Sequence, residues 1–184
     1  MHSTAYLGKN MAIENYEDFL PQIPKSAFIA NSADVIGRVT LGEESSIWYN
    51  ATLRGDINEI HVGYRSNIQD NAVLHLSDDH PCIIGDYVTV GHSAIVHAAT
   101  IEDNVLIGMG AIILDGSIIG NGSLVGAGAL VTGRSKIPPN SLVLGSPARV
   151  IRPLKEEEKG EGRALAEKYV YQSRKFLANN SRLG

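Results

Sequence analysis

The stretch IEDNVLIGMGAIILDGSIIGNGSLVGAGALVTGRSKIPPNSLV, residues 101–143, decides the fold of this chain. Isoleucine or valine returns at every sixth position, at Ile101, Ile107, Ile113, Ile119, Val125, Val131, Ile137 and Val143. A period of six differs from the 3.6 residues of an α-helix and from the two of an amphipathic strand. It is typical of a parallel β-helix, in which each unit is a short strand and a turn. Three units make one coil of about eighteen residues, so the predicted cross-section is a triangle.

The same register extends toward the N-terminus, interrupted by short insertions. Its earlier aliphatic positions are Val35, Leu41, Ile47 and Leu53, then Val62, Ile68 and Leu74, then Ile84, Val90 and Val96. We therefore expect an all-β solenoid over residues 23–153, preceded by an irregular arm over residues 1–22. Residues 154–184 are expected to contain an amphipathic α-helix, from about residue 162 to 178, that packs on the outside of the prism. Its apolar side chains are Leu165, Tyr169, Phe176 and Leu177.

Composition and charge narrow the class of partner. The chain has 184 residues, 43% of them hydrophobic and 20% charged, and a net charge of -4. This balance argues against nucleic acid or an anionic membrane as partner, because both require a basic face. No segment has the roughly 18 apolar residues of a membrane span, and the N-terminus lacks the pattern of a secretory signal. The single cysteine, Cys82, excludes a disulfide framework and a cysteine-rich zinc site, so we expect a cytoplasmic protein.

Two histidines are brought together by the predicted coil. Counting one face per six-residue unit stacks three strands on one side of the prism, which we call face A. These strands are centred on Leu53, Leu74 and Val96, and the outward residues that follow them are Arg54, His75 and His97. Neighbouring strands lie ~4.8 Å apart, so His75 and His97 are predicted neighbours in space. Two imidazoles at that spacing can tilt onto one metal ion.

A third histidine lies on a different side of the prism. His92 follows Val90 on face C, one coil above Asp70. Outward directions on two faces of a triangular coil diverge by about 120°, so His92 is not expected to join the pair within one chain. Threefold packing brings face C of one prism against face A of the next. This arrangement predicts a homotrimer with three equivalent interfacial metal sites, whose three histidines suit Zn²⁺ and also Fe²⁺ or Co²⁺.

The first strand of the histidine ladder carries a pair of opposite charges. Arg54 and Asp56 are both outward residues of this strand, two positions apart, and are placed for an ion pair. Buried at a subunit interface, such a pair would orient both side chains. It is either a structural salt bridge or a direct participant in the chemistry.

Four segments carry a resemblance to a known family. They are LRGD (53–56), SNIQDNAVLH (66–75), VTVGHSAIVHAATI (88–101) and VLIGMGAIILDG (105–116). They closely resemble the gamma-class carbonic anhydrases and their bacterial homologues, over about residues 23–154. The resemblance implies a left-handed β-helix and a homotrimer that binds metal through His75 and His97 of one subunit and His92 of the next. It also implies reversible hydration of carbon dioxide to bicarbonate, with metal-bound hydroxide as the nucleophile.

The resemblance assigns further residues around the metal. Gln69 matches a residue that hydrogen-bonds the metal-bound water, and Asn67 matches one near the carbon dioxide pocket. Arg54 and Asp70 match residues at the subunit interface. Tyr169, in the C-terminal helix, matches a tyrosine near the metal.

The sequence departs from the family pattern where protons are expected to be transferred. Ile57 stands where the best-known members have a glutamate, and residues 76–83 form a much shorter loop than theirs. Asp78, Asp79 and His80 lie in this loop. His80 is either a group that titrates near neutral pH or part of a solvated turn.

Three functions are compatible with these observations. The first is a carbonic anhydrase that acts on carbon dioxide and bicarbonate. The second is another metal-dependent or acyl-transferring enzyme of the same hexapeptide-repeat fold, using the same cleft. The third is a non-catalytic metal-binding trimer with weak or no anhydrase activity.

Overall fold

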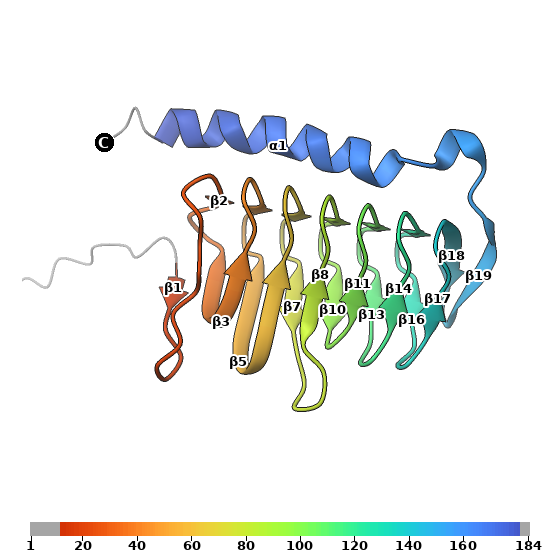
Figure 1. Ribbon diagram of the computed structural model, residues 1–184, viewed down its shortest axis with the longest axis horizontal. Coiled ribbons are helices and arrows are strands. Elements are labelled where there is room, and N and C mark those ends of the chain that lie inside the picture. Colours follow the sequence, from red (N-terminus) through yellow and green to blue (C-terminus); the bar gives the residue numbers. More distant parts are fainter. Residues whose placement is uncertain (1–11, 181–184) are drawn as a thin grey trace, which may run out of the picture.

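The computed structural model describes residues 12–180, which form a parallel β-solenoid of about seven turns with one C-terminal helix (Figure 1). The β-solenoid predicted from the period of six is therefore confirmed. Two strands, β3 (Asp34–Leu41) and β5 (Thr52–Val62), bend across an edge of the prism and belong to two faces each. Helix α1 (Glu161–Asn180) runs along the length of the solenoid.

The other strands are short and stack into three faces. Face A holds the first halves of β3 and β5, then β7 (Val73–His75), β10 (Ile95–His97), β13 (Ile112–Ile113) and β16 (Leu130–Val131). Face B holds their second halves, then β8 (Cys82–Ile84), β11 (Thr100–Ile101), β14 (Ile118–Ile119) and β17 (Lys136–Ile137). Face C holds β2 (Phe28–Ile29), β4 (Ser46–Ile47), β6 (Asn67–Ile68), β9 (Thr89–Val90), β12 (Leu106–Ile107), β15 (Leu124–Val125) and β18 (Ser141–Gly145). Outside this stack, β1 (Ala12–Glu14) pairs with β3, β19 (Ala148–Pro153) runs antiparallel to β18, and the 3-10 helix η1 (Glu156–Glu158) precedes α1.

The strand registers agree with the assignment of residues to faces that the sequence predicted. On face A, Leu74 pairs with Leu53 on one side and with Val96 on the other. On face C, Ile68 pairs with Val90. All five side chains are fully buried. The period-six positions therefore fill the inside of the prism, and the residue after each one faces outward.

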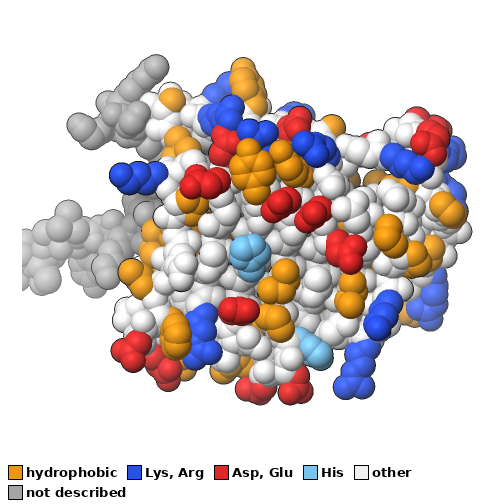
Figure 2. Space-filling view, viewed as in Figure 1, with side chains coloured by type: hydrophobic (Ala, Val, Ile, Leu, Met, Phe, Trp, Pro, Cys, Tyr) orange, Lys and Arg blue, Asp and Glu red, His pale blue; other side chains and the backbone are white. Residues whose placement is uncertain are grey.

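The outer surface is mixed in character. On the side shown in Figure 2, acidic and basic side chains are interspersed, and hydrophobic side chains occur in small groups between them. Among residues 12–180, no helix combines the length and the apolar character needed to cross a membrane.

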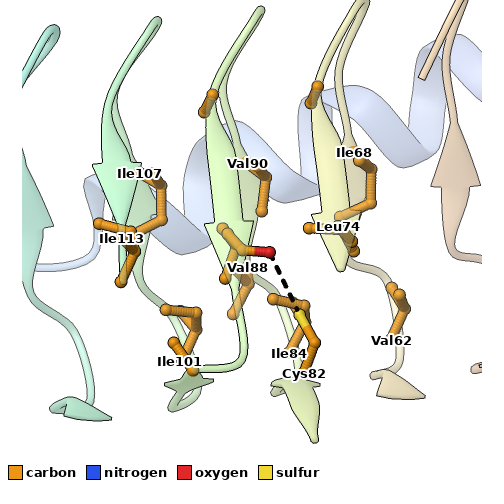
Figure 3. Close-up of a cluster of buried hydrophobic side chains, with 14 of the residues drawn as sticks. Val62, Ile68, Leu74, Cys82, Ile84, Val88, Val90, Ile101, Ile107 and Ile113 are labelled. Carbon is orange, nitrogen blue, oxygen red and sulfur yellow. Dashed lines mark hydrogen bonds between the residues drawn. The ribbon is translucent and has the colours of Figure 1, made fainter. Parts of the chain in front are cut away.

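The interior of the prism is a column of branched aliphatic side chains (Figure 3). Cys82 lies in this column, where its thiol donates a hydrogen bond to the carbonyl oxygen of Val96 at 3.7 Å. Burial raises the pKa of the Cys82 thiol to about 12. The thiol therefore stays protonated at neutral pH, which makes it a small apolar core residue rather than a nucleophile.

Helix α1 lies on face C, where it contacts β2, β4, β6 and β9. The helix residues buried most deeply are small or medium-sized: Gly162, Ala166, Val170 and Ser173. A Cβ atom at Gly162 would lie 2.3 Å from the carbonyl oxygen of Asn104. Glycine is therefore required where the first turn of the helix approaches the solenoid backbone.

Larger apolar side chains flank this contact line and are only partly buried. They are Leu165, Tyr169, Phe176 and Leu177, the residues that predicted the helix. Compared with the predicted span of 162–178, the helix begins one residue earlier and ends two residues later. The Trp48 ring lies edge-on to Tyr169 and Phe176, with centroids 5.3 and 5.4 Å away. These aromatic contacts hold α1 on face C.

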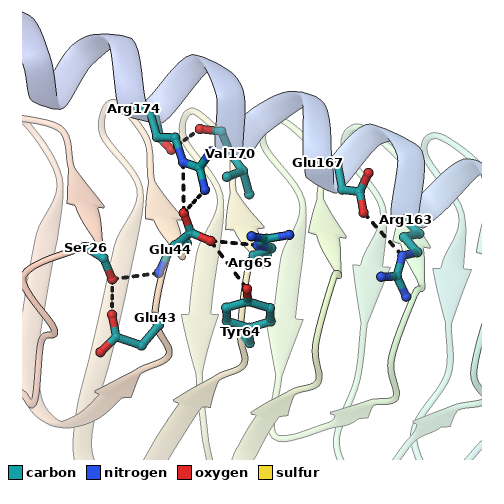
Figure 4. A network of polar contacts seen from close by, with 10 residues as sticks. Ser26, Glu43, Glu44, Tyr64, Arg65, Arg163, Glu167, Val170 and Arg174 are labelled. Carbon is teal, nitrogen blue, oxygen red and sulfur yellow. Dashed lines mark hydrogen bonds and ion pairs between the residues drawn. The ribbon is translucent and has the colours of Figure 1, made fainter.

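An ion-pair network ties the helix to the edge between faces B and C (Figure 4). Glu44 accepts hydrogen bonds from Arg65 Nε at 2.7 Å and from Arg174 Nε at 2.8 Å. The hydrogen bond from Arg174 lowers the pKa of Glu44 below its usual value, burial opposes this shift, and Arg65 adds to it. Glu44 is therefore ionised at neutral pH and links two coils of the solenoid to α1.

Candidate metal centre

Strands β7 and β10 present two histidines side by side on face A. The strand register pairs His97 with His75. His75 Nδ1 lies 3.2 Å from His97 Nε2, the ring centroids are 5.2 Å apart, and the ring planes are tilted by 49°. The His75 side chain is 17% exposed and that of His97 is 33% exposed. The two facing nitrogens therefore lie near the surface of face A.

The ring of His75 is held by a carboxylate from β5. Asp56 Oδ1 lies 3.1 Å from His75 Nε2, and Asp56 Oδ2 pairs with the Arg54 guanidinium. Burial raises the pKa of Asp56, but hydrogen bonds from the Ile57 amide and from His75, with the charge of Arg54, bring the pKa below its usual value. An ionised carboxylate only accepts hydrogen bonds, so His75 Nε2 carries the proton. Arg54 thus reaches His75 only through Asp56.

The ring of His97 is held in the same way by a residue of the next coil. Asp115 Oδ1 lies 2.6 Å from His97 Nδ1. Burial raises the pKa of Asp115, but the hydrogen bond from His97 brings the pKa below its usual value. Asp115 is therefore ionised, and His97 Nδ1 carries the proton.

Two lone pairs consequently face each other between the rings. Because the ring protons point to carboxylates, His75 Nδ1 and His97 Nε2 oppose each other as acceptors across 3.2 Å. Such a contact is repulsive unless a proton or a cation lies between the nitrogens. An imidazole whose other nitrogen donates to a carboxylate is the usual form of a metal-binding histidine. The residues present therefore fit a divalent metal ion.

His92 follows β9 on face C and is held by its own carboxylate. Its Nδ1 lies 2.7 Å from Asp70 Oδ2, and Asp70 Oδ1 accepts the amide hydrogen of Tyr49 at 3.1 Å. This contact leaves Nε2 as the ring nitrogen that can meet a ligand. Within residues 12–180 of one chain, no group of three or more His, Cys, Asp or Glu side chains is arranged to hold a metal ion. The structure brings His75 and His97 together and leaves His92 on a different face.

Two buried side-chain amides hold the backbone at His92 in place. Gln69 Oε1 accepts the backbone amide hydrogen of His92 at 3.2 Å, and Gln69 Nε2 donates to Asn67 Oδ1 at 3.2 Å. Asn67 in turn donates to Thr89 Oγ1 at 2.8 Å. Both amides are almost completely buried. Their hydrogen bonds therefore fix one orientation for each, as in a pre-organised polar network.

A groove of about 350 Å³ lies on face C beside His92. Its apolar lining includes Leu106, Met109, Leu124 and Leu165, and its polar lining includes Gln69, Thr89, His92 and Tyr169. Burial raises the pKa of Tyr169, and the charge of Asp70 adds to this shift. Tyr169 therefore remains a hydrogen-bond donor at neutral pH, and helix α1 brings it into the same groove as Gln69 and His92.

The short loop occupies residues 76–81 in the structure, between β7 and β8, and is held at the edge between faces A and B. The Ser77 amide donates to the His80 carbonyl oxygen at 3.0 Å and closes a turn. Asn58 Nδ2 donates to the carbonyl oxygens of Ser77 and Asp78 at 3.1 and 3.3 Å. His80 Nε2 lies 3.2 Å from the position that a Cβ at Gly116 would occupy. The loop therefore rests on β5 and on the coil that contains Asp115.

Asp115 was not singled out by the sequence analysis. It lies two residues after Ile113, which pairs with Val96 in the strand beside it. The signal that would have found it is an acidic side chain at the end of a face A strand, in the coil after His97.

Comparisons with known proteins agree with this geometry. A family model described as "Bacterial transferase hexapeptide (six repeats)" matches residues 98–133. "Probable carbonic anhydrase" of Methanocaldococcus jannaschii is 57% identical over 148 residues, which cover 80% of this chain and 93% of that protein. "Gamma carbonic anhydrase 1, mitochondrial" of Arabidopsis thaliana is 42% identical over 83% of this chain and 58% of its own length. This chain belongs to the gamma-class carbonic anhydrase family.

Two further relatives match nearly the whole chain. "Carbonic anhydrase" of Geobacillus kaustophilus is 48% identical over 89% of this gamma-class chain and 90% of that protein. The solved structure of a hexapeptide transferase family protein from Anaplasma phagocytophilum is similar with a TM-score of 0.86 and 39% identity, over 90% of this chain and 98% of that chain. The resemblance predicted from four short segments is thus confirmed, and curated relatives are named as carbonic anhydrases.

Proposed function

We propose that this member of the gamma-class carbonic anhydrase family catalyses the reversible hydration of carbon dioxide to bicarbonate in the cytoplasm, at metal sites between the subunits of a homotrimer. Each site takes His75 and His97 from one subunit and His92 from the partner subunit. The observation that carries the proposal is the 3.2 Å contact between His75 Nδ1 and His97 Nε2, whose other ring nitrogens both donate to carboxylates. Three imidazoles suit Zn²⁺, and Fe²⁺ or Co²⁺ can use the same ligands.

The distribution of apolar side chains supports association of faces A and C. Ile57 at the edge of face A and Met109 beside the groove on face C are 47% and 60% exposed. Ile95, which precedes His97 on β10, is 36% exposed. Exposed apolar groups next to a site are typical of a surface that a protein partner covers. Closed threefold symmetry would cover both surfaces in every subunit.

The residues of the chain supply position and environment. A divalent cation held by three imidazoles lowers the pKa of a bound water to ~7 and so provides a nucleophile at neutral pH. Asp56 holds the proton on His75 Nε2 and Asp70 holds the proton on His92 Nδ1, which orients both rings. Gln69, fixed by its own hydrogen bonds, offers a polar amide to the groove. The apolar lining suits uncharged carbon dioxide, whereas bicarbonate is better solvated by water.

Metal analysis combined with stopped-flow carbon dioxide hydration tests the proposal. We expect a trimer by light scattering, one metal ion per chain, and hydration above the buffer rate. His92→Ala should remove metal from every interface. A monomer, or unchanged metal content in His92→Ala, would contradict the shared site. Full occupancy by Zn²⁺ and by Fe²⁺ without hydration would instead indicate a metal-binding trimer that is not an anhydrase.

Acyl transfer is the second candidate function. It is favoured by the groove beside His92, which is large enough for part of an extended thioester, and by the transferase names of the family model and of the Anaplasma protein. Calorimetric titration with acetyl-coenzyme A separates the two functions. Binding, together with transfer of the acetyl group to an amine acceptor and release of the free coenzyme A thiol, would favour acyl transfer. A trimer that hydrates carbon dioxide and does not bind the thioester would favour the anhydrase.

A further inference from the structure

Three carboxylates each hold one of the three histidines, and Asp115 makes the shortest contact. Its Oδ1 lies 2.6 Å from His97 Nδ1, compared with 2.7 Å for Asp70 and His92 and 3.1 Å for Asp56 and His75. Asp56 and Asp70 belong to segments already discussed as parts of the site. Asp115 comes from the next coil and has no role in the proposed reaction.

We infer that Asp115 is a positioning residue that selects the metal-binding form of the His97 ring. The inference rests on the proposed function, because it takes His97 as a metal ligand.

The geometry gives Asp115 this role because His97 has two possible neutral forms. With Asp115 in place, the ring proton lies on Nδ1 and the lone pair of Nε2 faces His75. Without Asp115, the proton can move to Nε2 and donate to His75 Nδ1 across the same 3.2 Å. That hydrogen bond would satisfy both rings without a metal ion. An ion would then have to displace a proton as well as bind, so its affinity would fall.

The affinity for Co²⁺, measured by chelator competition on the full-length protein, tests the inference. Asp115→Asn keeps the size but no longer selects one ring form, because an amide can either accept a hydrogen from His97 Nδ1 or donate one to it, and we expect the Kd for Co²⁺ to rise about 10- to 100-fold. The matched control is Asp103→Asn, because the Asp103 carboxylate accepts a backbone hydrogen from Asp86, which an amide oxygen can also do. This control should stay within about twofold of the wild type. A Kd for Asp115→Asn within about twofold of the wild type would overturn the inference.

A second measurement does not require metal. Proteins labelled with ¹⁵N-histidine report the protonated ring nitrogen by NMR, with His97→Gln used to assign the signals. We expect the Nδ1–H form of His97 in metal-free wild type and a shift toward Nε2–H in Asp115→Ala. An unchanged ring form in Asp115→Ala would overturn the inference. If the wild type bound no Co²⁺, the proposed function would fail, and this NMR comparison would still decide the role of Asp115.

Discussion

Faces A and C each carry part of the candidate site, but their histidines have different surroundings. Face A offers His75 and His97 on adjacent strands, near the surface and held by carboxylates. Face C offers His92 alone, which is also held by a carboxylate but is supported by the buried amides of Asn67 and Gln69 and flanked by a groove that α1 helps to form. Regular coiling is enough to create the pair, whereas the groove also needs the helix. Face A therefore offers ligands alone, whereas face C offers one ligand together with the groove beside it.

The largest expected effect is the loss of metal on removing one histidine ligand from either face. His75→Ala removes a ligand from face A and His92→Ala removes one from face C, so each variant alone should bind no metal at its interfaces. If the variants are unfolded and refolded together, an interface is intact wherever face A of a His92→Ala chain meets face C of a His75→Ala chain. Random mixing should restore about one quarter of the sites. Metal analysis and hydration assays measure this recovery, and no recovery in mixed trimers would contradict a shared site.

Gln69 tests whether the groove on face C contributes to the reaction independently of metal affinity. We expect Gln69→Ala to lower kcat/KM for carbon dioxide about 100-fold, because a fixed polar group is lost from the groove. Metal content should stay at the wild-type level. Gln172→Ala, on α1 but outside the lining of this groove, is the control and should leave both quantities unchanged. A parallel loss of metal in Gln69→Ala would show that Gln69 acts through His92 instead.

Gly162 tests how far face C depends on its helix. A methyl group at this position would meet the Asn104 carbonyl oxygen, so Gly162→Ala should lower the free energy of unfolding by about 1–3 kcal/mol. Urea titration followed by circular dichroism measures the change. Ala164→Ser, at an exposed position of the same helix, should stay within about 0.5 kcal/mol. Unchanged stability in Gly162→Ala would mean that α1 does not need this close approach.

Glu44 gives the smallest effect and a definite pH dependence. Its folded pKa is lowered from 4.5, so its stabilising contribution is complete above that pH and is lost as the pH falls through the folded value. Glu44→Gln should therefore reduce stability by about 1 kcal/mol at pH 7, and the difference from wild type should shrink as the pH falls below 4.5. Thermal unfolding at several pH values measures this. Glu167→Gln, in an exposed pair with Arg163, should show little difference at any pH.

The path of the chain could be predicted from the sequence because each coil buries one aliphatic side chain per face. A shift of one position would turn Leu74 or Val96 outward, so the period-six positions determine the register. The same constraint predicted that His75 and His97 would be neighbours. The helix was less predictable in detail, since its deepest contacts use small residues such as Gly162 and Ala166, which carry no hydrophobic signal.

Contacts between outward side chains could not be predicted from the period-six pattern. The pattern shows which residues leave the core, but not how their side chains turn at the surface. Arg54 was expected on the histidine ladder, yet Asp56 is the residue that contacts His75. Asp115 was missed because it comes from a coil with no histidine of its own.

The buried thiol of Cys82 allows the opening rate of the central coils to be measured. It is the one cysteine of the chain and lies on β8, which pairs with β5 and β11. In a solenoid each coil contacts only its neighbours, so the ends can fray while the middle stays closed. A thiol reagent would react with Cys82 only during openings that reach β8. Its reaction rate therefore reports how often β8 separates from β5 and β11, without any label added to the protein.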